Sequence, residues 1–206
     1  MLGEKDDSAK QKILTAAKAE FMERGFADAS MRTIAERAGF TTGMLYSRFA
    51  DKAELFRELV EGPANELYGY FLGIQNEFAA YPPEEQKTQM HTYVAAKVER
   101  MIDILYSDFD AFKLILFRSN GSDYEFFIDR MIDVETRHTF RFIGVLRDLG
   151  HDVPEIRKDF AHMMSSAMLN GMFEVVMHDL SKEDARAYIG LLQEFFNAGW
   201  DKLFGF

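Results

Sequence analysis

The chain has 206 residues, 48 % of them hydrophobic, so it can bury a core and is not a disordered chain. It contains no cysteine, which excludes a disulfide framework, a thiolate nucleophile and a Cys-ligated zinc site. The net charge of -10 is divided unevenly, because residues 1–52 hold nine Lys/Arg and eight Asp/Glu, whereas residues 53–206 hold fifteen against twenty-six. A near-neutral first part can still bind DNA through locally placed cations, while the acidic second part would be kept away from it.

The beginning of the chain predicts neither a membrane anchor nor an exported protein. No run approaches the roughly 18 apolar residues of a membrane span. The first ten residues, MLGEKDDSAK, lack the apolar core of a signal peptide. We therefore expect a cytoplasmic protein without a membrane partner.

Residues 8–24 predict the first helix. Ser8 and Gln11 have the spacing of a capping box, and apolar residues from Ile13 to Phe21 form one stripe. Gly25 is expected to end this helix, which would support the segment that follows.

The stretch SMRTIAERAGFTTGMLYSRFADK, from Ser30 to Lys52, predicts two short helices around a glycine-containing turn and the start of a third helix. Ser30 can cap the first helix, and Gly39 supplies the permissive backbone that a tight turn needs. Thr41 or Thr42 can cap the second helix, which would span about seven residues. This is the pattern of a DNA-binding helix-turn-helix.

The second short helix has an inward and an outward face. Leu45 and Phe49 lie four apart and can pack inward together. The outward residues are small, hydroxylic or cationic, which suits base edges and phosphates. Lys52 lies in the first turn of the next helix, where the helix dipole does not favour a cation, so it requires another partner. The candidate DNA-binding residues are Arg32, Thr33, Thr41, Thr42, Gly43, Tyr46, Ser47, Arg48 and Lys52.

The segment TTGMLYSRFADKAEL resembles the recognition helix and following helix of TetR-type (tetracycline-repressor-like) transcriptional regulators, and the similarity extends back to about Lys10. The match is specific because it is spread over about a dozen positions. In that family the tyrosine and the lysine contact DNA phosphates, which the resemblance carries over to Tyr46 and Lys52. Ser47 and Arg48 stand where an aromatic residue and a histidine are frequent, so only a pseudo-palindromic double-stranded operator is implied, not its sequence.

The rest of the chain predicts helices only, since it shows neither two-residue alternation nor an Asn-Gly hairpin turn. We expect an all-α fold, with a three-helix helix-turn-helix domain over residues 1–52 and a helical effector-binding and dimerisation domain over residues 53–206. Gly62-Pro63 predicts a kink or break in the helix that begins near Asp51, because proline lacks a backbone N–H. Later helices are expected at roughly 85–106, 109–118, 123–149, 154–179 and 182–204.

Aromatic residues and methionines are abundant in the second part of the chain. Core packing accounts for any single one of them, but part of this adaptable set can also line a cavity for an apolar small-molecule effector. Gly62-Pro63 could then be a hinge that transmits the binding of the effector, or it could only shape the helix. The candidate effector-binding residues are Leu67, Tyr68, Phe71, Leu72, Met101, Phe112, Phe117, Phe127 and Met168.

The last two predicted helices combine bulky apolar residues with small ones that would let helices approach closely. The TetR resemblance implies that these helices form a four-helix bundle in a homodimer. Completion of the core within one subunit is the alternative. The candidate interface residues are Met164, Gly171, Val175, Leu192, Phe196, Gly199 and Trp200.

A di-metal bundle enzyme is a third possibility, because Glu135 with His138 and Asp159 with His162 have an acid-to-histidine spacing that such enzymes use. Those sites also need glutamates from two further helices, and the arginines near His138 indicate a solvated face with ion pairs. We therefore expect neither a metal nor another cofactor, and no enzymatic activity. The expected function is a ligand-responsive DNA-binding transcriptional repressor, with a constitutive DNA-binding protein as the main alternative.

Overall fold

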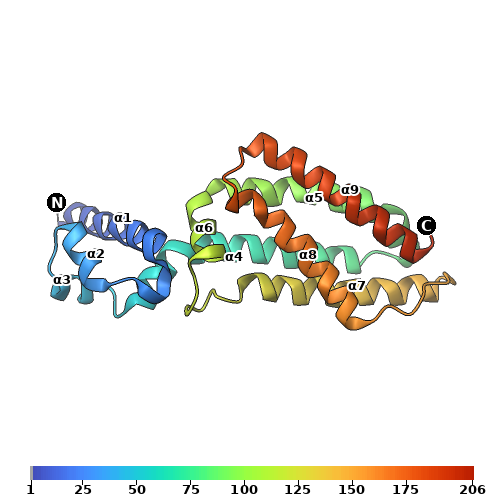
Figure 1. Ribbon diagram of the computed structural model, residues 1–206, viewed down its shortest axis with the longest axis horizontal. Coiled ribbons are helices and arrows are strands. Elements are labelled where there is room, and N and C mark those ends of the chain that lie inside the picture. Colours follow the sequence, from blue (N-terminus) through green and yellow to red (C-terminus); the bar gives the residue numbers. More distant parts are fainter. Residues whose placement is uncertain (1) are drawn as a thin grey trace. The chain divides into compact units, whose positions relative to one another are not determined.

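A computed structural model describes residues 2–206, without the side chains of residues 2–6 and 94. Every regular element in that range is a helix (Figure 1), so the predicted all-α fold is confirmed. The helices are α1 (Leu2–Asp28), α2 (Met31–Ala38), α3 (Thr42–Tyr46), α4 (Lys52–Ala79), α5 (Pro83–Ser107), α6 (Phe109–Phe117), α7 (Phe127–Asp148), α8 (Lys158–Met177) and α9 (Lys182–Phe204).

The chain divides into two compact units. The first is the chain up to Asn65 together with Asp108–Phe126, and the second is Glu66–Ser107 together with Phe127–Phe206. The boundary between them lies inside α4, later than the expected boundary at residue 52, and the first unit also takes in α6.

In the first unit, α6 packs on α1. The backbone N–H of Phe26 donates to the carbonyl of Arg118 over 2.7 Å, and Lys18 pairs with Asp110 at 2.6 Å. Gly25 adopts φ 75° and interrupts the helical backbone of α1, as the sequence predicted, but one more turn follows as far as Asp28. That conformation is available to glycine without strain.

Three rings form the centre of the first unit. Phe21 and Phe56 are fully buried and meet edge to face, with ring centroids 5.0 Å apart. Phe26 lies 5.3 Å from Phe56 in a similar geometry. Such pairs hold α1 and the first turns of α4 together through dispersion and quadrupole attraction.

Helix α4 continues through Pro63, so the predicted break at Gly62-Pro63 does not occur. Val60, Ala64 and Leu67 are buried on both sides of the proline. An apolar face that continues in this way holds the helix against its neighbours although proline removes one backbone hydrogen bond.

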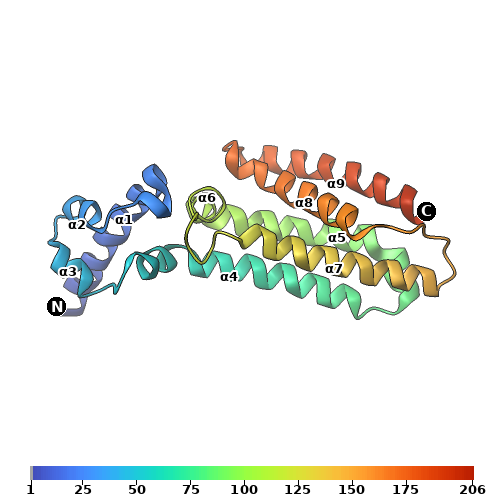
Figure 2. The same ribbon diagram turned by 60° about the horizontal axis from the view of Figure 1, so that its bottom comes forward.

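In the second unit, the part of α4 after Asn65 runs beside α5 and α7 (Figures 1 and 2). Helix α8 packs on α7, and α9 packs on α5 and α8. Helix α7 begins at Phe127 instead of residue 123, because residues 119–125 form turns in which Ser122 Oγ accepts from the N–H of Tyr124. Helix α8 begins at Lys158 instead of residue 154. The segment before it is held by the Arg147 guanidinium, which donates to the carbonyl of Pro154 over 2.9 Å.

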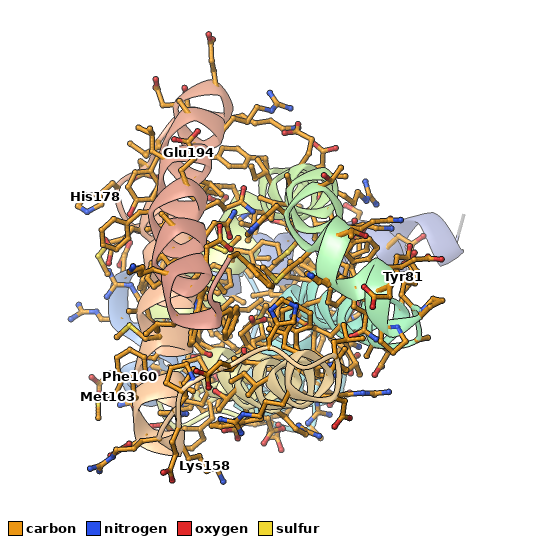
Figure 3. All side chains as sticks on the ribbon, turned by 90° about the vertical axis from the view of Figure 1, so that its right-hand side faces the viewer. Tyr81, Lys158, Phe160, Met163, His178 and Glu194 are labelled. Carbon is orange, nitrogen blue, oxygen red and sulfur yellow. The ribbon has the colours of Figure 1, made fainter. Side chains whose placement is uncertain are left out.

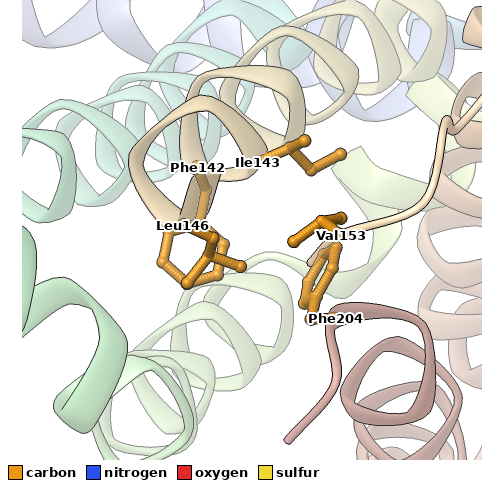
Figure 4. Close-up of a cluster of buried hydrophobic side chains, with 5 residues drawn as sticks. All are labelled: Phe142, Ile143, Leu146, Val153 and Phe204. Atoms are coloured by element: carbon orange, nitrogen blue, oxygen red, sulfur yellow. The ribbon is translucent and has the colours of Figure 1, made fainter. Parts of the chain in front are cut away.

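A cluster of buried apolar side chains joins the C-terminal parts of α7 and α9 to the segment that links α7 to α8 (Figure 4). This contact explains why residues near Val153 stay outside a helix: the side chain is buried there, with 6 % exposure. The cluster consists of Phe142, Ile143, Leu146, Val153 and Phe204.

Candidate nucleic-acid interface and internal cavity

The helix-turn-helix has the caps that the sequence predicted. Ser30 Oγ accepts from the N–H of Thr33 at 3.4 Å and begins α2. Gly39 ends α2 in the left-handed conformation, with φ 78° and ψ 28°. Thr41 Oγ1 accepts from the N–H of Met44 at 3.2 Å and begins α3. Each cap satisfies a backbone donor that a helix terminus leaves unpaired.

Helix α3 has five residues, fewer than the seven expected. It ends early because the last turn tightens: the backbone N–H of Arg48 donates to the carbonyl of Leu45, three residues back, over 3.0 Å. Ser47 Oγ also donates to the carbonyl of Met44 over 2.7 Å. Leu45 is fully buried and Phe49 is 4 % exposed, so the predicted inward pair is confirmed.

The outward side of α3 presents polar groups. Tyr46 is 51 % exposed, and Gly43 and Ser47 are exposed beside it. Thr41, which caps α3, is exposed too, while Thr33, Thr42 and Arg48 are partly buried. Arg32 on α2 is exposed and forms an ion pair with Glu36 at 2.8 Å.

Lys52 finds partners inside the protein. Its Nζ donates to the carbonyl of Ala27 over 2.8 Å and to that of Ala29 over 3.3 Å. The same ammonium lies 4.8 Å from the centroid of the Phe26 ring. Lys52 therefore ties the end of α1 to the beginning of α4, which answers the need for a partner that the sequence raised.

A cavity of about 170 Å³ lies in the second unit, between α4, α5, α7, α8 and α9. Three of the nine predicted effector-binding residues line it: Phe71, Met101 and Met168. The other six do not. Leu67, Phe112 and Phe127 are buried, Tyr68 and Leu72 are partly buried, Phe117 is exposed, and Phe112 and Phe117 belong to α6 in the first unit.

Most of the cavity wall consists of residues outside the predicted effector set. From the sequence alone, its aromatic part is indistinguishable from general core or from a subunit interface. The polar residues of the wall do leave a signal in the sequence, because they are isolated polar residues on otherwise apolar helix faces. The lining residues absent from the predicted effector set are Ile74, Gln75, Phe78, Ala79, Gln86, Met90, Lys97, Val98, Glu135, His138, Thr139, Arg141, Phe142, Leu169, Met172, Gln193, Phe196, Asn197, Trp200 and Phe204.

Two groups of α7 that line this cavity have shifted pKa values. Burial raises the pKa of Glu135 to about 7, and a hydrogen bond from the Gln75 amide to its Oε2 partly opposes that shift. Burial and the nearby charges of Arg141 and Arg137 lower the pKa of His138, whose buried Nδ1 has no hydrogen-bond partner. His138 therefore faces a cavity, and the expected solvated face with ion pairs is wrong at this position.

The two acid-to-histidine pairs do not come together. Asp159 and His162 line a different groove on the surface, where Asp159 pairs with Arg157. Across the described part of the chain, no group of three or more His, Asp or Glu side chains is placed to hold a metal ion. The described helices also include none that is long and apolar enough to cross a membrane.

The predicted interface residues on α8 and α9 lie in different environments. Val175 is buried, Gly199 is exposed, and the other five are partly buried. A Cβ on Gly171 would lie 3.1 Å from Leu192 Cδ2, so this glycine allows close packing of α8 on α9 within one chain. Phe196 and Trp200 line the cavity.

Other apolar side chains of α8 and α9 are exposed. Leu191 and Phe195 of α9 are 68 % and 75 % exposed, four residues apart on one helix face. Met163 of α8 is 58 % exposed, and Figure 3 shows Phe160 and Met163 pointing outward on the same side.

Comparisons with known proteins agree with this geometry. Residues 13–59 match the model of the family described as bacterial regulatory proteins, tetR family. The chain is 30 % identical over 102 residues to the HTH-type transcriptional repressor KstR2 of Mycobacterium tuberculosis, an alignment that covers 50 % of this chain and 51 % of the relative. It is 28 % identical over 109 residues to the HTH-type transcriptional activator FasR of Mycolicibacterium smegmatis, covering 53 % and 46 %.

The chain thus spans about half the length of the curated relatives it matches. In fold it is similar to SmeT, the repressor of a multidrug efflux pump of Stenotrophomonas maltophilia, with a TM-score of 0.54, 19 % identity and coverage of 92 % of this chain and 89 % of the other. Together with the helix-turn-helix geometry, the match of residues 13–59 to the tetR family supports a TetR-type regulator.

Proposed function

We propose that the protein is a homodimeric transcriptional regulator that binds a pseudo-palindromic DNA operator and responds to a small molecule, most simply as a repressor released by that molecule. The observation that carries this proposal is the capped α3, which buries Leu45 and presents Tyr46 and Ser47 outward. A short helix that is anchored on one face and polar on the other suits insertion into the major groove. Such a regulator would act in the cytoplasm, where the chromosome is.

Contacts with phosphates and with bases should differ in their consequences. We assign Tyr46 to a phosphate contact, because its exposed hydroxyl can donate to a phosphate oxygen whatever the base sequence. We assign Ser47, Thr42 and Arg32 to contacts with base edges. Gly43 is exposed and has no side chain, so the backbone can approach the groove closely there. Arg48 could contribute to either kind of contact.

Two copies would be needed for a palindromic operator, with their recognition helices roughly 34–36 Å apart to meet successive major grooves. The exposed apolar residues of α8 and α9 support a second copy of this chain as the partner that covers them, because two-fold dimers bury self-complementary surfaces. The internal cavity supports the response to a small molecule and favours a ligand-responsive regulator over a constitutive DNA-binding protein.

Selection of duplexes from a random library by the purified protein tests this function. We expect a pseudo-palindromic sequence to be enriched at low salt, with affinity that falls steeply as salt rises. Tyr46→Phe should weaken all duplexes alike, whereas Ser47→Asn should shift the enriched sequence. Tyr188→Phe, on α9, is the matched control for the loss of a hydroxyl. A wild-type protein that enriches no sequence would contradict the proposal.

A further inference from the structure

The cavity places one acidic group among apolar and aromatic side chains. Glu135 is the only acidic residue among the described residues that line it. Its Oε2 accepts a hydrogen bond from the neutral amide of Gln75, and no ion pair to Glu135 is found in the described part of the chain. A carboxylate in such surroundings loses hydration that a neutral amide only partly replaces.

The two cations of the cavity wall are already engaged elsewhere. Lys97 of α5 pairs with Glu77 at 3.3 Å, and its Nζ lies 5.1 Å from the ring centroid of Tyr93. Arg141 of α7 donates to the carbonyl of Ala79 over 3.1 Å. The described lining residues from α8 and α9 carry no charge, so no cation of the cavity wall forms an ion pair with Glu135.

His138 does not supply that charge either. Burial lowers its pKa, which keeps the imidazole neutral near pH 7, and its buried Nδ1 has no hydrogen-bond partner. The described part of the cavity wall therefore holds an acid that pairs with no cation, and a histidine whose buried Nδ1 has no hydrogen-bond partner. Both groups lie on α7, three residues apart on one face.

We infer that the cavity binds a small lipophilic cation, an aromatic or alkyl amine, with its ammonium group beside Glu135 and its apolar part against the rings of Phe71, Phe142 and Trp200. The inference rests on the proposed role of the cavity as the effector site. The ammonium would provide the missing counter-charge, and the rings would bury the apolar part of the ligand. A cavity of about 170 Å³ resembles one of about 150 Å³ that takes benzene, so it suits a ligand with a single ring.

Binding should depend on pH in one direction. Because burial raises the pKa of Glu135 to about 7, the carboxyl group is mostly protonated below that pH and mostly ionised above it. A cation gains its counter-charge only from the ionised form. The affinity for an amine that stays protonated should therefore rise as the pH increases through 7, and binding should release a proton from the protein.

Calorimetry on the full chain with three probes tests the inference. Phenethylamine carries the charge, phenethyl alcohol is its neutral counterpart of similar size, and hydrocinnamate is the anionic counterpart. We expect phenethylamine to bind at least tenfold more tightly than the alcohol at about pH 8, with most of that preference lost at about pH 5.5. Glu135→Gln keeps a group that can accept from Gln75 and should abolish the preference. Asp133→Asn, which removes an exposed carboxylate of α7 outside the cavity wall, should retain it.

The outcomes separate this inference from the proposed function. Equal affinity for the amine and the alcohol, or a preference for the anion, overturns the cationic ligand class and leaves the cavity as an effector site. No binding of any probe at millimolar concentration overturns both the ligand class and the cavity as an effector site for small rings. Enrichment of a duplex by the same sample would still support DNA binding in that case. If Glu135→Gln fails to fold, the affinities of the wild type for the amine and the alcohol at the two pH values still test the inference. The amine should be preferred at about pH 8 and not at about pH 5.5.

Discussion

Lys52 illustrates how a single side chain can have a role that its sequence motif does not reveal. Its ammonium donates to the carbonyls of Ala27 and Ala29 at the end of α1, and it lies over the Phe26 ring. Hydrogen bonds from a charged donor contribute on the order of 1–2 kcal/mol when the site is partly buried. We therefore assign Lys52 a bracing role between α1 and α4, whether or not it also reaches a phosphate.

We expect Lys52→Met to lower the free energy of unfolding by about 1 kcal/mol, because methionine keeps most of the apolar stem and removes the donor. Thermal denaturation without DNA should show the melting temperature reduced by about 2–4 °C. Lys12→Met, at an exposed position of α1, controls for the loss of one positive charge. If Lys52→Met melts like the wild type but loses DNA affinity, Lys52 contributes through the phosphate alone.

Among the helices, α9 has the exposed apolar face that most directly predicts dimer formation. Leu191 and Phe195 lie one turn apart and are both mostly exposed, so a double change to glutamate should place two charges in any interface that covers them. We expect Leu191→Glu/Phe195→Glu to convert the proposed dimer to a monomer in sedimentation equilibrium, and to weaken operator binding by at least tenfold.

Gln89→Glu, at an exposed position of α5, serves as the control for an added charge on a helix of the same unit. A double variant that remains a dimer would locate the subunit contact away from this face. The same measurement on Phe196→Ala separates the roles of neighbouring residues, because Phe196 lines the cavity and its loss should change ligand binding more than assembly.

The elements that local sequence determines were predicted well. Ser30, Gly39 and Thr41 act as the sequence indicated, because a cap depends on backbone groups within three or four residues. The starts of α7 and α8 were predicted too early, because periodicity continues into segments that turns and a buried Val153 hold outside the helices. Those contacts depend on tertiary structure.

The two candidate sites also differ in how far local sequence determines them. The outward residues of the helix-turn-helix follow from a pattern that lies within about twenty residues, whereas the cavity is assembled from five helices that are distant in sequence. The abundance of aromatic residues predicted a cavity of some kind but could not show which rings face it. Glu135 and His138 have the spacing of a metal site in the sequence, but they line the cavity in the folded chain because of contacts between distant helices.

At the scale of the whole molecule, a ligand can change DNA affinity only if it binds one conformation of the dimer better than another. Helix α4 is common to both compact units, since the boundary at Asn65 lies within it. Its first turn holds Lys52, and beyond the boundary it contributes Phe71 and Gln75 to the cavity wall. We therefore propose α4 as the element through which effector binding reaches the helix-turn-helix.

Pro63 is the position at which this proposal can be tested. Proline removes one hydrogen bond from the helix interior, which makes bending there easier, and Pro63→Ala restores the bond and strengthens the helix by up to about 3 kcal/mol. If Pro63 is a hinge, the operator affinity without ligand should be retained in Pro63→Ala, while the loss of affinity caused by an effector should change several-fold. Both quantities can be measured by fluorescence anisotropy of a labelled operator.

Gly69→Ala provides the matched control for a stiffer α4. Gly69 is exposed, and a Cβ placed on it would meet nothing within 4 Å, so this change raises helix propensity by about 1 kcal/mol without touching the proline. A hinge at Pro63 predicts that Pro63→Ala alters the response to the effector and Gly69→Ala does not. Equal responses in both variants and the wild type would mean that Pro63 only shapes α4. Equal changes in both variants would mean that the flexibility of the helix as a whole, not a bend at one residue, transmits the signal.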